Sequence, residues 1–295
     1  MKFVEKASGW MIAIGLAIAV LLAFNYLDVF VLVGFRNAGI DTKIYRGVYS
    51  ATAALLNTVL FGALFIVCKK IKRPILKAKK IGFFDVMLLL IVAAGMLGFV
   101  ETFIYVSDNI AEYIKSISEQ MTEYRNSVDR YTGISRDAVP LWDTVLYLIT
   151  LCFIVPLEEE LIFRGAIFGV LREKMKPSAA VLISALLFGV MHRVSVHTIY
   201  AVVCGMILSA CYYYTESIFA SITIHSVFNI VGSGLGELLK IKELGVPAVV
   251  RNEVLNNANA VCIVAMVPAA IAFLILRHNA KKSRQEQAGS VAVSE

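Results

Sequence analysis

The sequence predicts an all-α protein, a polytopic membrane bundle of about eight transmembrane helices. The first reason is composition, because 59% of the 295 residues are hydrophobic and only 17% are charged, whereas a soluble domain carries about 25% charged residues. The second reason is that several apolar runs reach the roughly 20 residues that a helix needs to cross a bilayer. Lys and Arg gather between these runs, where they set orientation. The net charge of +6 therefore indicates membrane topology, and no nucleic-acid partner is expected.

The expected spans follow one another along the chain. The first comes after Lys2 and Lys6 and is too long for a signal peptide, so we expect it to be retained. The fourth contains Pro156, which removes a helical hydrogen bond and predicts a kink. The eight spans are 9–27, 48–68, 83–106, 143–170, 178–193, 196–214, 217–234 and 258–276.

The connections predict the orientation. Residues 69–80 contain seven Lys and Arg and no acid, and residues 172–176 and the C-terminal tail are also basic. With eight spans these segments share one side with the N-terminus, and the positive-inside rule places that side in the cytoplasm. We therefore expect a multi-pass protein with both termini cytoplasmic, and the compact basic loops favour a bacterial plasma membrane.

The opposite side carries a predicted amphipathic helix within residues 107–140, and residues 235–257 contain a second candidate. The residues after the final span are expected to form a disordered tail. The apolar positions of the first amphipathic segment recur at helical spacing: Ile110, Tyr113, Ile114, Ile117, Met121 and Tyr124.

Three consecutive acids, Glu158, Glu159 and Glu160, lie inside the apolar run of the fourth span. A carboxylate at membrane depth costs roughly 2.5–3.5 kcal/mol on insertion scales, so it needs a partner and usually has a function. Glu160 and Arg164 are four residues apart and share a helix face, so one can neutralise the other. This segment is therefore the first candidate for chemistry.

Two histidines lie in neighbouring apolar runs. His192 follows Phe188 by four residues, and His225 precedes Asn229 by four, so each pair shares a helix face. Glu159 lies 16 residues before the turn at 175–176 and His192 lies 16 residues after it, on the order of 24 Å in both cases. We expect these polar side chains to form one layer. His197, at the outer end of the sixth span, is expected to face a loop.

Such a layer allows several functions. A carboxylate and a neutral histidine can take a proton from water, and a second histidine with an amide can stabilise an oxyanion. Alternatively, two histidines and a carboxylate (Glu159, His192 and His225) are a common set of ligands for zinc or another divalent metal. Intramembrane acids and histidines also line ion and proton pathways in transporters. A further interpretation is that these side chains make purely structural polar contacts. The residues alone leave these possibilities open.

Three motifs, in order and on separate spans, resemble the CAAX protease and bacteriocin-processing family of intramembrane proteases, which includes the type II CAAX prenyl endopeptidases. They are EExxxR (Glu159, Glu160, Arg164), FxxxH (Phe188, His192) and HxxxN (His225, Asn229). The resemblance covers residues 140–235, and implies a helical bundle of about eight spans that encloses a catalytic cavity.

The resemblance also implies roles. Glu159 and His192 would activate water, and His225 and Asn229 would stabilise the oxyanion or help to bind a divalent metal. Both a metal-dependent and a metal-free mechanism have been described for the family. Glu158 is an acid that the motif does not require. The supporting residues would be Glu160, Arg164 and Phe188.

The resemblance divides the chain into four segments. Residues 1–135 are N-terminal spans, 140–235 the catalytic core, 236–276 an outer loop and the last span, and 277–295 the tail. The expected activity is an intramembrane endopeptidase that cuts a membrane-associated peptide or a prenylated CAAX-type protein tail, in contact with the lipid bilayer. The alternatives are a non-proteolytic bacteriocin-immunity or scaffold protein and a transporter.

Overall fold

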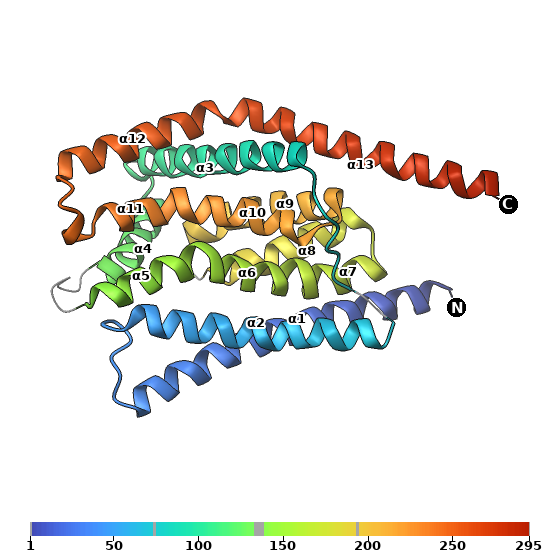
Figure 1. Ribbon diagram of the computed structural model, residues 1–295, viewed down its shortest axis with the longest axis horizontal. Helices are drawn as coiled ribbons and strands as arrows, with labels where there is room; N and C mark the ends of the chain where they lie inside the picture. The colour runs from blue at the N-terminus through green and yellow to red at the C-terminus, as the bar shows by residue number, and fades with distance from the viewer. Residues whose placement is uncertain (1, 73–74, 133–138, 193–194, 295) are drawn as a thin grey trace.

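The computed structural model describes residues 2–72, 75–132, 139–192 and 195–294, and these form an all-helical membrane bundle (Figure 1). Within these residues the only β-type pairing is one isolated bridge between Ala78 and Ser217. Helices α1 (Lys2–Asn37) and α2 (Arg46–Lys70) lie along one side of the bundle, and α3 (Phe83–Ala111) lies along the other beside α12 (Ala248–Val264) and α13 (Met266–Ser294). The segments that carry the motifs lie between these two layers.

The described residues contain five helices long and apolar enough to cross a membrane, or six if one bent pair is counted as a single span. The bent pair is Ala248–Val264 with Met266–Gly289, at 49°. The predicted helical membrane bundle is thus confirmed, whereas the count of eight is not. Helix α8 (Pro177–Val190), at the predicted fifth span, is apolar but short.

The predicted fourth span is one continuous helical path with two π-helical segments. Its parts are α5 (Leu141–Ile149), η2 (Thr150–Ile154), α6 (Val155–Glu160), η3 (Leu161–Ile167) and α7 (Phe168–Lys174). Pro156 lies in the first turn of α6, directly after the first π segment, where its missing N–H is tolerated. The π segments widen the helix on both sides of the three glutamates, a distortion that is frequent at functional sites.

Close helix contacts in the upper layer depend on glycine. A Cβ at Gly98 of α3 would lie 2.1 Å from the Cys262 carbonyl oxygen of α12, and one at Gly95 would lie 2.2 Å from the Ala269 Cβ of α13. Small residues allow the backbones of membrane helices to approach in this way. Helices α3, α12 and α13 are thereby held together in one layer.

The remaining helices complete the core and its outer end. Helix α9 (Ser195–Thr215) packs against α8, and α10 (Ile218–Asn229) continues through η4 (Ile230–Gly234) into α11 (Leu235–Leu239). The predicted amphipathic helix is α4 (Lys115–Thr132), whose Met121 is buried. It begins later than the predicted pattern, because Ile110 belongs to α3 and Tyr113 and Ile114 lie in the turn before α4. Residues 133–138 of the predicted segment lie outside the described part. The C-terminal tail differs from expectation, because α13 continues as a helix through Ser294.

Both termini lie at one end of the bundle, together with the segment that joins α2 to α3 (Figure 1). We call residues 75–81 of this segment the basic strap. Its Lys77 N–H donates to the Tyr212 hydroxyl at 2.8 Å, its Lys79 N–H donates to the Glu216 carbonyl at 3.1 Å, and its Lys77 carbonyl accepts from the Ile218 N–H at 2.9 Å. The strap therefore ties the N-terminal helices to the turn between α9 and α10.

Candidate active site

A buried ion pair forms the base of the site. Arg164 Nη1 donates to Glu160 Oε1 at 2.8 Å, and both side chains are completely buried. Arg164 also donates to the Gly205 carbonyl of α9 at 3.3 Å, and its guanidinium lies 4.6 Å from the ring centroid of Phe188. The pairing expected from the four-residue spacing is present, and it connects η3 with α8 and α9.

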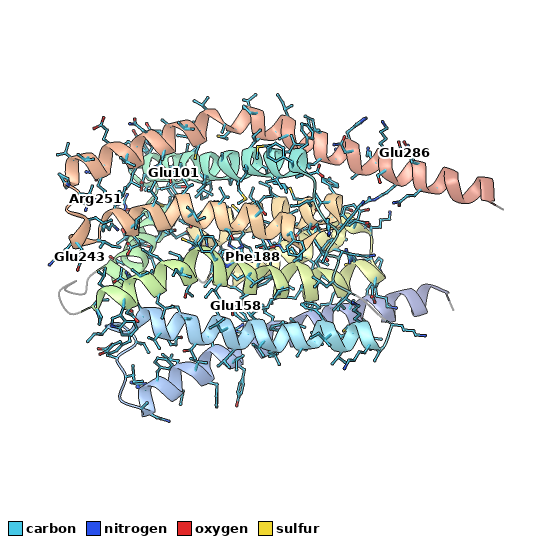
Figure 2. All side chains as sticks on the ribbon, in the orientation of Figure 1. Glu101, Glu158, Phe188, Glu243, Arg251 and Glu286 are labelled. Carbon is cyan, nitrogen blue, oxygen red and sulfur yellow. The ribbon has the colours of Figure 1, made fainter. Side chains whose placement is uncertain are left out.

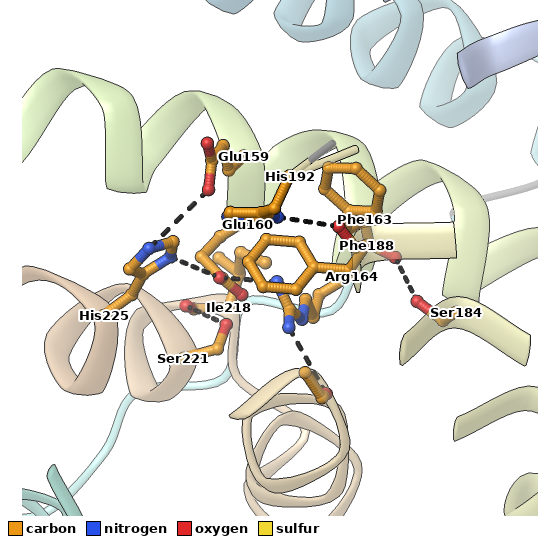
Figure 3. Close-up of polar contacts among 11 residues, drawn as sticks. Glu159, Glu160, Phe163, Arg164, Ser184, Phe188, His192, Ile218, Ser221 and His225 are labelled. Atoms are coloured by element: carbon orange, nitrogen blue, oxygen red, sulfur yellow. Dashed lines mark hydrogen bonds and ion pairs between the residues drawn. The ribbon is translucent and has the colours of Figure 1, made fainter. Parts of the chain in front are cut away.

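His225 of α10 lies between two of the glutamates (Figure 3). Its Nδ1 is 2.8 Å from Glu160 Oε1, and its Nε2 is 3.6 Å from Glu159 Oε2. A carboxylate accepts hydrogen bonds, so the short contact assigns a proton to Nδ1. The Glu159 side chain is 21% exposed, whereas that of Glu160 is fully buried. Glu159 is thus the one of these two acids that can meet a substrate or water.

His192 enters the site from the end of α8. Its Nδ1 lies 2.9 Å from the Phe188 carbonyl oxygen, which can only accept, so Nδ1 carries the proton and Nε2 is free to act as a base in the neutral ring. The Phe188 ring packs edge-on against His192, with centroids 4.8 Å apart. Among the described residues Glu159 pairs with His225 and makes no direct contact with His192. Glu159 and His192 thus approach the site from different helices, α6 and the end of α8.

Asn229 lies one helical turn beyond His225, as its spacing predicts. Its Nδ2 donates to the Leu151 carbonyl at 2.8 Å, within the first π segment. One of its two amide N–H groups is thus committed to the backbone of η2, and the other remains as a donor. The widened helix also exposes carbonyl groups to partners outside the helix, which accounts for this contact.

The site includes residues that the sequence reasoning missed. The His197 ring lies 4.4 Å from that of His192 and stacks on Tyr200 at 4.7 Å, and Tyr124 of α4 packs edge-on against both His197 and Tyr200. Burial raises the pKa of the Tyr124 hydroxyl. The expectation that His197 faces a loop was therefore wrong, because α4 folds over the outer end of α9 and covers it. The spacing of His197 and Tyr200 by three residues was the available signal.

Glu158 lies where α6 faces α2 (Figure 2). It is only 5% exposed, and its carboxyl group neighbours Asn57 of α2. Asn57 is fully buried and donates to Asp28 of α1 at 3.1 Å. The three consecutive acids therefore serve different surroundings, two in the histidine layer and one between α6, α2 and α1.

The proposed metal ligands do not converge in this arrangement. Among the described residues no group of three or more His, Cys, Asp and Glu side chains could hold a metal ion. Within the described part of the chain, no hydrogen bond or ion pair joins Glu159 to His192, and the Nε2 of His225, the ring nitrogen not used by Glu160, lies 3.6 Å from Glu159 Oε2. These residues as placed do not fit a divalent metal, and we derive no step through one.

Comparison with known proteins identifies the segment that carries the site. Residues 141–231 match the family described as type II CAAX prenyl endopeptidase Rce1-like. Comparisons with curated proteins and with solved structures gave no match. The match begins at α5 and ends in η4, so it includes all three motifs and the layer formed by Glu159, Glu160, His192 and His225. The similarity to the Rce1-like type II CAAX prenyl endopeptidase family therefore covers the segment that carries the site.

Proposed function

We propose that this integral membrane protein is an endopeptidase that hydrolyses a peptide bond of a membrane-associated peptide or prenylated protein tail with water activated by Glu159. The observation that supports it most is the position of His225, which the buried Glu160–Arg164 pair holds beside the partly exposed Glu159 carboxylate. A base that activates water and a preorganised group that stabilises the oxyanion are two components that acyl hydrolysis uses.

The proposed reaction begins with a water between Glu159 and His192. The Glu159 carboxylate takes one proton, Nε2 of His192 orients the water, and its oxygen bonds to the carbonyl carbon of the substrate. The resulting oxyanion accepts hydrogen bonds from the Nε2–H of His225, when that nitrogen is protonated, and from the second amide N–H of Asn229. The carbon–nitrogen bond then breaks as Glu159 returns the proton to the leaving amine.

The substrate and orientation form part of the same proposal. The basic strap, Arg172 and both termini lie at one end of the bundle (Figure 1), and the positive-inside rule makes this the cytoplasmic end. We place the protein in a bacterial plasma membrane, with substrate reaching the site from the bilayer or the cytoplasm.

The chain offers a matched pair of variants for a test. Glu159→Gln removes the base without changing size, and Glu158→Gln makes the same change in the neighbouring acid that faces α2. In cells with equal membrane levels of each protein, mass spectrometry would search for new peptide termini. We expect Glu159→Gln to lower their formation at least about a hundredfold, since a general base contributes that much or more. Glu158→Gln should stay close to wild type. Termini that persist with Glu159→Gln, or are missing with wild type, would reject the proposal.

One observation favours a second function, ion or proton transport. Buried Glu158 and Asn57 and partly buried Asp28 form a polar group outside the histidine layer, and such groups at membrane depth occur along transport pathways. In proteoliposomes a transporter would show flux that Glu158→Gln abolishes and Glu159→Gln leaves intact. Absence of flux with wild-type protein would remove this candidate.

A further inference from the structure

A cavity of about 160 Å³ lies at the basic end of the bundle, apart from the histidine layer. Its walls are the basic strap, the start of α3, the turn between α9 and α10, and one face of α13. A single water needs about 10–15 Å³ on the same scale, so the cavity has room for a polyatomic group. Nothing in the proposed peptidase reaction uses this space.

The position of the cavity restricts what can fill it. The turn that lines the cavity joins the span Val196–Thr215 to the span Ile218–Leu239. This turn therefore marks the edge of the membrane on this side of the bundle. Ile81, Leu276 and Tyr214 line the cavity together with charged side chains. Apolar groups, an aromatic ring and charges meet in this way at the depth of lipid headgroups. A headgroup reaches this depth with its acyl chains remaining in the bilayer.

Three cationic side chains line the cavity, Lys79 and Lys80 from the basic strap and Arg284 from α13. Arg284 is held in place, because it donates to the Tyr213 carbonyl at 2.9 Å and its guanidinium lies 4.2 Å from the Tyr213 ring centroid. Lys79 is positioned by its backbone hydrogen bond to Glu216. Cations gathered from two separate elements suit a phosphate group.

Two acids, Asp85 and Glu216, line the same cavity. Glu216 adopts a φ of 52°, a left-handed conformation that a non-glycine residue adopts at an energetic cost and that is common at ligand sites. An isolated phosphate would be repelled by these carboxylates, and an isolated amine would be repelled by the lysines. A ligand that carries both charges matches both sets.

We propose that this cavity binds the headgroup of an aminophospholipid. The phosphodiester lies against Lys79, Lys80 and Arg284, and the primary ammonium lies against Asp85 and Glu216. A primary ammonium has three N–H donors for carboxylates, whereas the quaternary ammonium of choline has none. The bound lipid connects the basic strap, α13 and the turn that precedes α10.

The test measures lipid retention by purified full-length protein with native mass spectrometry. The protein is exchanged in turn into phosphatidylethanolamine, phosphatidylcholine and phosphatidylglycerol with identical acyl chains. We expect preferential retention of one phosphatidylethanolamine. The variant Lys79→Gln/Lys80→Gln should lower that retention roughly tenfold, as expected for the loss of two cations near a headgroup. The control Lys281→Gln/Lys282→Gln changes two exposed lysines of α13 that do not line the cavity, and should retain lipid like wild type.

Two further measurements test which part of the lipid is recognised. Asp85→Asn/Glu216→Gln should remove the preference for ethanolamine over choline, because it removes the ammonium partners. Glycerophosphoethanolamine, which lacks acyl chains, should fail to displace the lipid at equal concentration. Equal retention of ethanolamine and choline lipids, unchanged retention by the Lys79/Lys80 variant, or displacement by the soluble compound would each overturn the proposal.

Discussion

At the scale of single residues, the run of three glutamates shows how strongly position within a helix turn determines chemistry. Glu160 points into a dry pair with Arg164, Glu159 faces His225 with part of its carboxylate exposed, and Glu158 faces α2. Successive residues of a helix point about 100° apart, so neighbouring identical side chains meet different partners. The sequence predicted the Glu160–Arg164 pair because that pair is local. The contact between His225 and Glu160, 65 residues apart, required the fold.

The buried ion pair leads to a prediction about stability. Arg164→Ala leaves the Glu160 carboxylate without its cation in a site with no solvent, so we expect a loss of about 3–5 kcal/mol in the free energy of unfolding. Denaturant titration of the purified protein measures it. Arg164→Met/Glu160→Gln removes both charges and keeps an acceptor for His225, so it should recover at least half of the lost stability. An Arg164→Ala protein as stable as wild type would contradict this account.

The stacked rings beside the site lead to a prediction about rate. His197→Ala removes the ring that packs on His192 and Tyr200, so His192 gains freedom and we expect kcat to fall roughly tenfold with little change in KM, as misplacement of a reacting group does. His197→Phe keeps an aromatic ring in the stack and should restore most of the rate. Steady-state kinetics on a reporter peptide would measure both variants. If His197→Phe were as slow as His197→Ala, stacking would not be the reason.

At the scale of elements, the sequence predicted the helices well where hydrophobicity alone decides them. The long spans α2 and α3, the amphipathic α4 and the close agreement of α9 with the predicted sixth span follow from apolar length and periodicity. The π segments around the glutamates were not predicted, since they leave no pattern in the sequence; in the fold they contact α2 and α10. The helical C-terminal segment was missed because its composition resembles that of a polar tail.

The contact between α3 and α12 can be tested with one methyl group. Gly98→Ala places a Cβ about 2.1 Å from the Cys262 carbonyl oxygen, so the helices must separate. We expect a loss of about 1–3 kcal/mol in the free energy of unfolding, as is usual for overpacking. Gly62→Ala is the control, because a Cβ there meets nothing within 4 Å, and thermal unfolding of both variants gives the comparison. Equal stability of the two variants would show that the contact adapts without cost.

At the scale of the whole molecule, two layers of apolar helices enclose a polar centre built from α6, η3, α8 and α10 (Figure 1). The layers bury the Glu160–Arg164 pair completely, which strengthens electrostatic interactions there because water is excluded. The same arrangement gathers the basic segments and both termini at one end. The orientation proposed for the protein thus depends on the fold as a whole, since no single loop decides it.

The isolated bridge between Ala78 and Ser217 has a consequence for the order of synthesis. Ala78 is translated long before Ser217, so the strap can occupy its place at the membrane surface while the site helices are still unmade. Closing a long intervening segment costs chain entropy that grows only slowly with length. When α10 finally emerges, its first residues pair with a partner already in position. The helix that carries the last motif of the site thus begins beside a segment from the first third of the chain.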